Sequence, residues 1–133
     1  MKEESTMTEI KNLGKIDITL LESEYGKIQT DEIIITNERI MHIKERHPED
    51  FELFNKYGTE SVRHPDMIIK DEKHTETIFM IKKLPGTNLN VVVRVVLETD
   101  EDGLKNSVMT FYRIRERNLR KLEEKNKLLY KRE

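Results

Sequence analysis

The chain has 133 residues and a formal net charge of −2, with 38% charged and 35% hydrophobic residues. This length fits one domain around a single core, and the clear runs of Val, Ile, Leu and Phe argue against disorder. The lack of cysteine excludes disulfides, thiolate catalysis and cysteine-bound zinc. With no signal-like segment and no stretch long enough to cross a bilayer, the sequence predicts a cytoplasmic protein without a membrane partner.

Charge is unevenly distributed along the chain. Residues 1–32 hold four basic and eight acidic side chains, whereas residues 115–133 hold eight basic and four acidic ones. A basic C-terminal segment can bind a polyanion, but a Lys/Arg-rich terminal helix is more often a solvated face, so the signal for nucleic acid is weak.

Residues 1–35 give only weak secondary-structure patterns until the apolar run at their end. Residues 1–13 are polar without periodicity, which predicts a loose leader before a single domain over residues 14–133. Residues 15–21 alternate in part and predict a short edge strand, followed by a turn near Gly26. The apolar run at residues 32–35 predicts a strand that leads directly into a helix.

That helix carries the densest group of titratable side chains, in the stretch TNERIMHIKERHPEDF from Thr36 to Phe51. The Thr36 hydroxyl can cap its first turn. Pro48 disfavours a helical conformation at the preceding residue, so the helix should end at Arg46 or His47.

The helical period gives the two histidines different surroundings. At 100° per residue, Ile40, Ile43 and His47 share one arc, which predicts that His47 points toward the core, while His42 and Arg46 lie on the flank. The alternative is a buried or C-capping His47 with a structural role. His42 and His47 lie about 140° apart around the helix, so they do not converge on a metal ion, and no metal site is predicted.

The rest of the chain predicts an α+β fold. A second helix is expected over residues 49–57 and ends at Gly58. Alternating segments at residues 66–70, 75–84, 90–98 and 105–113 follow, with turns at residues 85–86 and 100–103. They predict N-terminal helices packed on an antiparallel meander of four strands or slightly more, closed by an amphipathic basic helix over residues 115–131.

Two of these strands carry polar groups that suit an oxyanion. Arg94 is the one charge in VVVRVVL, and its planar guanidinium fits a phosphate, although an internal ion pair or an arginine that reaches solvent is the structural alternative. In the last strand, NSVMTFYRI, alternation places Asn106, Val108, Thr110 and Tyr112 on one face. Hydroxyl residues are also common in strands for reasons unrelated to ligands.

Taken together, ITNERIMHIKERHPEDF, HPDMIIKD, VVVRVVL and NSVMTFYRI resemble the phage-encoded nucleases of the barnase, EndoU, colicin E5/D and RelE group, over about residues 33–131. The resemblance implies an α+β fold and a metal-independent ribonuclease, often a toxin, that needs no cofactor. RNA is the expected partner. An antitoxin or immunity protein is left open as a second, and the oligomeric state and RNA target are not predicted.

Carried over by position, the resemblance marks six candidate catalytic residues: His47, Arg94, Thr110, Tyr112, Arg46 and His42. Lys82, Lys83 and Asn106 are candidate substrate-binding residues, and because the two lysines point to opposite faces, the sequence does not say which of them belongs to the site. Histidine suits acid–base catalysis because its charge changes near neutral pH. His47 is therefore expected to transfer the proton in cleavage to a 2′,3′-cyclic phosphate. The alternative function is a non-catalytic RNA-binding or protein-interaction module of a mobile element.

Overall fold

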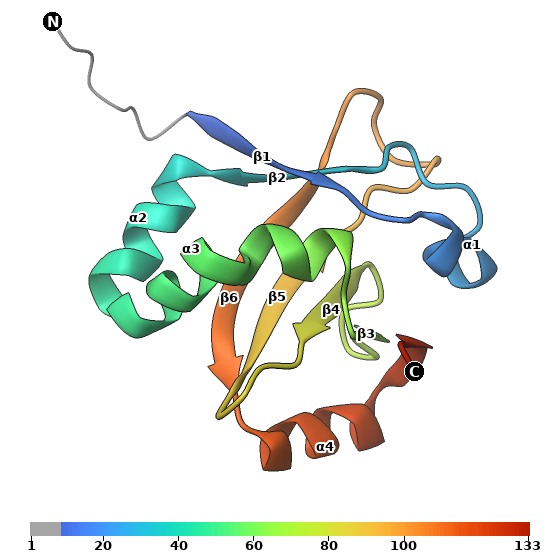
Figure 1. The fold of residues 1–133 in the computed structure, drawn as a ribbon. Coiled ribbons are helices and arrows are strands. Elements are labelled where there is room, and N and C mark those ends of the chain that lie inside the picture. Colours follow the sequence, from blue (N-terminus) through green and yellow to red (C-terminus); the bar gives the residue numbers. More distant parts are fainter. Residues whose placement is uncertain (1–8) are drawn as a thin grey trace, which may run out of the picture.

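The computed structural model describes residues 9–133, which form a seven-stranded sheet flanked by four helices (Figure 1). The strand order is β1-β2-β6-β5-β4-β3-β7, and within the described chain only the β2–β6 pair is parallel. In chain order the elements are β1 (Ile10–Lys15), α1 (Thr19–Tyr25), β2 (Glu32–Thr36), α2 (Asn37–Arg46), α3 (Pro48–Arg63), β3 (Met67–Lys70), β4 (Thr77–Lys82), β5 (Asn88–Arg94), β6 (Asn106–Ile114), α4 (Glu116–Lys125) and β7 (Lys127–Lys131).

The predicted α+β class and antiparallel meander are confirmed. Strands β3 to β6 follow one another in the chain and pair antiparallel in the same succession. Gly86, in the β4–β5 turn, has a φ of 88°, which the third position of a type II turn requires. The predicted size of the sheet is wrong, because β1 and β2 extend it beyond β6 and β7 extends it beyond β3.

The N-terminal predictions need correction. Residues 1–8 of the predicted leader lie outside the described residues, but residues 10–15 form β1, paired with β2. The strand predicted over residues 15–21 is largely replaced by α1. Asp17 explains the change, because its carboxylate accepts hydrogen bonds from the Thr19 backbone N–H (3.1 Å) and hydroxyl (2.6 Å) just before the helix.

Helix α2 has the predicted limits. The Thr36 hydroxyl accepts a hydrogen bond from the Arg39 backbone N–H at 3.2 Å, and the helix ends at Arg46 before Pro48.

Helix α3 continues through Gly58, where the sequence predicted a stop. A Cβ at Gly58 would lie 2.7 Å from the Phe54 ring, so this glycine gives the ring room against its own helix. The Phe54 ring stacks on Phe111 of β6 with centroids 3.9 Å apart. Gly58 is therefore a packing residue rather than a helix terminator.

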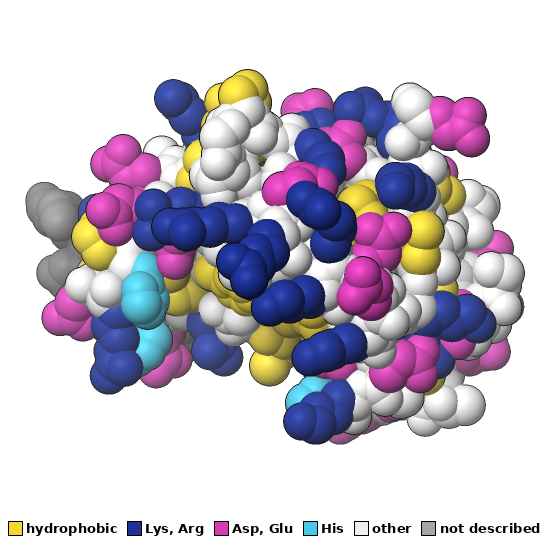
Figure 2. All heavy atoms as spheres, turned by 90° about the horizontal axis from the view of Figure 1, so that it is seen from below, with side chains coloured by type: hydrophobic (Ala, Val, Ile, Leu, Met, Phe, Trp, Pro, Cys, Tyr) yellow, Lys and Arg dark blue, Asp and Glu magenta, His cyan; other side chains and the backbone are white. Residues whose placement is uncertain are grey.

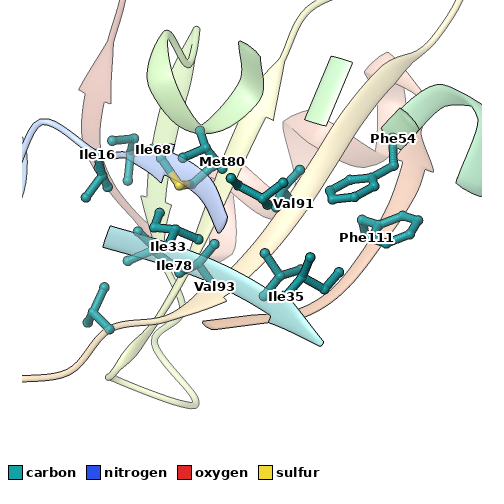
Figure 3. Packing of buried hydrophobic residues seen from close by; sticks show 14 of the residues in the cluster. Ile16, Ile33, Ile35, Phe54, Ile68, Ile78, Met80, Val91, Val93 and Phe111 are labelled. Atoms are coloured by element: carbon teal, nitrogen blue, oxygen red, sulfur yellow. The ribbon is translucent and has the colours of Figure 1, made fainter. Parts of the chain in front are cut away.

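Both faces of the sheet pack against a helix. Helix α3 covers one face, where Phe54 joins Phe111, Val91, Met80 and the isoleucines of β2 (Figure 3). Helix α4 packs on the other face through Leu119 and Leu122. The helix predicted over residues 115–131 ends at Lys125, because the extended residues that follow pair with the open edge of β3 as β7.

Candidate active site

Strand β6 supplies two of the predicted catalytic residues, and β5 supplies a third. Phe111 faces α3 through its ring stack with Phe54. Thr110 and Tyr112 therefore face the opposite side, and they pair across the sheet with Val92 and Asn90. Arg94 has the same alternation as Val92, so Arg94, Thr110 and Tyr112 share one face. We call these three residues the sheet group.

A register shift in β6 changes which residues join this group. Val93 pairs with Val108 but Val92 pairs with Thr110, so Met109 is an extra residue in β6. Asn106 and Val108 were predicted to share a face with Thr110 and Tyr112, and this prediction is wrong because the extra residue reverses the alternation. Met109 itself is 36% exposed.

Arg94 lies at the end of β5 and is exposed, as in the alternative of an arginine that reaches solvent. Its guanidinium Nη2 lies 3.3 Å from Glu76 Oε1, and the two side chains are 57% and 37% exposed. The predicted alternative, an ion pair, is thus present, but such a solvent-screened pair contributes only about 0–1 kcal/mol. A phosphate can replace Glu76 at Arg94 with little loss of stability.

Tyr112 is held by an asparagine that the sequence did not single out. The Asn90 Nδ2 donates to the Tyr112 hydroxyl oxygen at 3.0 Å, and Asn90 is fully buried. Because the Tyr112 oxygen accepts this bond, its own hydrogen is available for another acceptor. The Asn90 Oδ1 is a buried oxygen with no hydrogen-bond partner among the described residues, which is rare in folded proteins.

The remaining catalytic candidates form a second group, on α2 and at the residue that follows it. His42, Arg46 and His47 are all exposed, and none of their side chains has a hydrogen bond or ion pair within residues 9–133. The prediction that His47 points toward the core is wrong. His47 lies beyond the helix with φ −139° and ψ 69°, so it leaves the arc on which Ile43 is buried. We call His42, Arg46 and His47 the helix group.

Helix α2 lies beside strand β6, which bears two members of the sheet group. Strand β2 pairs with β6 only at Ile33–Asn106 and Ile34–Ser107, and α2 starts shortly afterwards. Helix α2 therefore runs beside the part of β6 that has no strand neighbour on that side in the described chain (Figure 1). His47 joins α2 to α3, whose first turn contacts the end of β6 through Asp50 and Arg113, and α3 covers the face opposite Thr110 and Tyr112.

The two candidate lysines lie on opposite faces, as predicted. Lys82 is buried on the α3 side, where its ammonium donates to the His64 carbonyl oxygen at 3.1 Å beside the end of α3. Lys83 is on the face of the sheet group, and its ammonium contacts both Glu116 oxygens at 2.8 and 3.0 Å. Hydrogen bonds from Lys83 and Asn88 hold the pKa of Glu116 below its ordinary value. Both lysines thus have structural partners.

The side-chain amide of Asn106, the third substrate-binding candidate, forms hydrogen bonds within the fold through both its oxygen and its nitrogen. Its Oδ1 accepts from the Val96 backbone N–H at 2.8 Å, and its Nδ2 donates to the Thr30 and Glu32 carbonyl oxygens at 2.8 and 3.0 Å. These bonds join β6 to the segment before β2 and to the segment after β5. Asn106 is therefore structural.

The sequence did not identify the polar end of β6. There the Asp50 carboxylate accepts from the Arg113 Nε at 2.6 Å and from its backbone N–H at 3.3 Å, which fixes the first turn of α3 to the strand. Arg115 follows just before α4. On this side of the molecule, Figure 2 shows a diagonal band of Lys and Arg side chains, with histidine side chains near both of its ends and hydrophobic atoms beside it. The alternating Arg-Ile-Arg at the end of the strand was the available signal.

The described residues contain neither a cluster of metal ligands nor a helix that could span a membrane. No group of three or more His, Asp or Glu side chains is arranged to hold a metal ion within residues 9–133. No helix in that range has the length and hydropathy needed to span a membrane.

Comparison with known proteins identifies the family. The family model described as phage-Barnase-EndoU-ColicinE5/D-RelE like nuclease2 matches residues 8–131. No curated protein and no solved structure gives a significant match. Because the match spans nearly the whole chain, the chain belongs to this nuclease family, and the predicted resemblance is confirmed.

Proposed function

We propose that this member of the phage-Barnase-EndoU-ColicinE5/D-RelE like nuclease family is a metal-independent endoribonuclease of a phage or mobile element. The observation that carries the proposal is the position of the histidine-bearing α2 beside β6, whose Thr110 and Tyr112 share a face with Arg94. A proton-transfer group and cationic and hydroxyl donors are what phosphodiester cleavage by an internal nucleophile needs.

In the proposed reaction, the ribose 2′-hydroxyl attacks the adjacent phosphorus while the bond to the 5′-oxygen of the next nucleotide breaks. His47 takes the proton from the 2′-hydroxyl or gives one to the leaving oxygen, and the products are a 2′,3′-cyclic phosphate and a 5′-hydroxyl. Arg94 stabilises the charge on the phosphoryl oxygens. The Tyr112 hydroxyl, with its oxygen held by Asn90, donates its hydrogen to the same phosphate, and Thr110 orients it.

The helix group supplies the flank of this site. His42 and Arg46 are exposed on α2 and have no partner within residues 9–133, so both can approach a substrate bound at β6. We further propose that the protein acts in the cytoplasm as a toxin-like enzyme. An antitoxin or immunity protein that covers the same groups would neutralise it.

The proposal is tested by incubating the purified protein with mixed single-stranded RNA in EDTA. We expect fragments that end in a cyclic phosphate, which acid treatment opens and mass spectrometry identifies. Fragments that form only after a divalent cation is restored would refute metal independence. Binding of intact RNA without cleavage in either condition would favour the alternative, a non-catalytic RNA-binding module.

A further inference from the structure

A polar hollow of about 480 Å³ lies beyond the end of β6, apart from the sheet group and the helix group. It is bounded by the first turn of α3, the β4–β5 turn and the start of α4. Its lining residues are Asp50, Gly86, Thr87, Arg113, Arg115 and Asn118. Arginine, threonine and asparagine side chains are all hydrogen-bond donors that suit a phosphate.

The charge in this hollow is positive. Arg113 already neutralises Asp50 through the 2.6 Å contact between its Nε and Oδ1. The side chains of Thr87, Arg115 and Asn118 have no hydrogen bond or ion pair to any of residues 9–133. The hollow thus offers a guanidinium, an amide and a hydroxyl to a ligand without breaking a contact of the fold.

The positive surface continues along the outer side of α4. Arg117, Arg120, Lys121 and Lys125 are exposed there, and none forms an ion pair within the described chain. The neighbouring acids Glu116 and Glu123 are already paired, with Lys83 and Lys131. The band of Lys and Arg side chains in Figure 2 lies on this side of the molecule.

The hollow has a suitable position relative to the proposed site. Arg113 follows Thr110 by three residues on β6, a separation of about 10 Å along the strand, and its side chain points to the opposite face, where it contacts Asp50 of α3. The hollow extends past the end of the strand to Arg115 and Asn118. An RNA strand that leaves the sheet group along β6 can therefore place a neighbouring phosphate at the strand end.

We propose that Arg115, Asn118 and Thr87 form a subsite for an RNA backbone phosphate that flanks the scissile one, extended by Arg117 and Arg120 on α4. This inference rests on the proposed function for the identity of the ligand. The subsite binds substrate and takes no part in bond cleavage. Its loss should therefore raise KM and leave kcat unchanged.

The test uses Arg115→Ala/Asn118→Ala in the full chain, with Lys73→Ala as the matched control. Lys73 is exposed without an ion pair, in the β3–β4 turn, at the opposite end of the meander from the β4–β5 turn. Binding is measured with a short mixed-sequence 2′-O-methyl RNA, which lacks the nucleophile and stays intact. We expect affinity about tenfold weaker than that of the wild type and the control, and a salt slope lower by about 0.7 for the lost phosphate contact.

The outcomes separate this inference from the proposed function. If Arg115→Ala/Asn118→Ala binds RNA with the affinity and salt slope of the wild type, the subsite is overturned, even if the protein cleaves RNA. The subsite is also overturned if the wild-type protein does not bind the 2′-O-methyl RNA. Weaker binding by the variant of a protein that never cleaves RNA would support the subsite and overturn the ribonuclease. If Arg115→Ala/Asn118→Ala has a lower melting temperature than the wild type, the test uses Arg117→Ala/Arg120→Ala on the outer side of α4 instead. Weaker RNA binding by this second variant supports the proposal, and unchanged RNA binding refutes it.

Discussion

The two ends of the molecule use charged side chains in different ways. Where α1 meets β3 and β7, the Glu24 carboxylate contacts the Lys70 ammonium at 2.6 Å and the Lys127 ammonium at 2.7 Å. Where α2 and β6 end and α4 begins, His47 and Arg115 are exposed and have no partner within residues 9–133. The paired end joins three elements of the fold, whereas the unpaired end can bind an anion without losing any contact.

The largest expected effect is at the unpaired end. His47→Ala should lower the rate of RNA cleavage by about 10²- to 10⁴-fold, the usual contribution of a general acid or base. Its thermal melt should match that of the wild type, because the side chain is exposed and makes no described contact. Initial rates in EDTA measure the loss. His74→Ala, also exposed, serves as the control, and full activity in His47→Ala would remove His47 from the mechanism.

Arg94 tests an intermediate case, a cation with an exposed partner. Arg94→Ala should reduce kcat/KM by about 10- to 100-fold, since a hydrogen bond to a charged group contributes about 1.5–3 kcal/mol. Glu76→Gln removes the competing carboxylate and should leave activity equal or higher. Steady-state kinetics on both variants provide the measurement. If Glu76→Gln lowers kcat/KM as much as Arg94→Ala does, activity depends on the ion pair between the two residues and not on Arg94 alone.

Asn90 tests whether a buried polar group serves the site rather than the fold. Asn90→Leu should lower kcat by about tenfold and leave stability equal or higher, because it removes a buried oxygen that has no partner. In the Tyr112→Phe background the same change should have no further effect on kcat, since Asn90 acts through the Tyr112 hydroxyl. Kinetics and melts of all four proteins are compared. Additive losses of kcat would contradict this role.

The smallest effect is expected at the paired end. Hydrogen bonds from Lys127 and then Lys70 lower the pKa of Glu24 from its ordinary value of 4.5. A lowered folded-state pKa stabilises the protein above the unfolded value, and this stabilisation disappears as the pH falls through the folded value. Glu24→Gln should therefore lower the urea midpoint slightly at pH 7 and less in strong acid, with activity unchanged. An equal loss at both pH values would show that charge is not involved.

Some parts of the fold and site could be predicted because local chemistry determines them. Thr36 and Pro48 set the limits of α2, and alternation with a Pro-Gly turn is enough to specify the meander. Strands β1 and β7 were missed because both are polar edge strands whose extended form depends on pairing with β2 and β3.

The less predictable features depend on contacts between distant residues. Glycine is common at the end of a helix, but here the stack of Phe54 on Phe111 gives Gly58 a packing role inside α3. The extra residue at Met109 depends on the β5 register, so alternation alone placed Asn106 on the wrong face. Asn90 lies within an apolar run, and only the structure shows its contact with Tyr112.

The short parallel ladder between β2 and β6 has a consequence for the order of folding. It pairs residues about seventy positions apart, whereas the meander closes through short turns. Closing the longer loop costs more chain entropy, so we expect the ladder to form after the meander. Pulse-labelled hydrogen exchange during refolding should then show protection of the β4 and β5 amides before those of β2. Simultaneous protection of all three strands would exclude this order. In that sequence of events α2 reaches β6 last, and a partly folded chain has no assembled nuclease site.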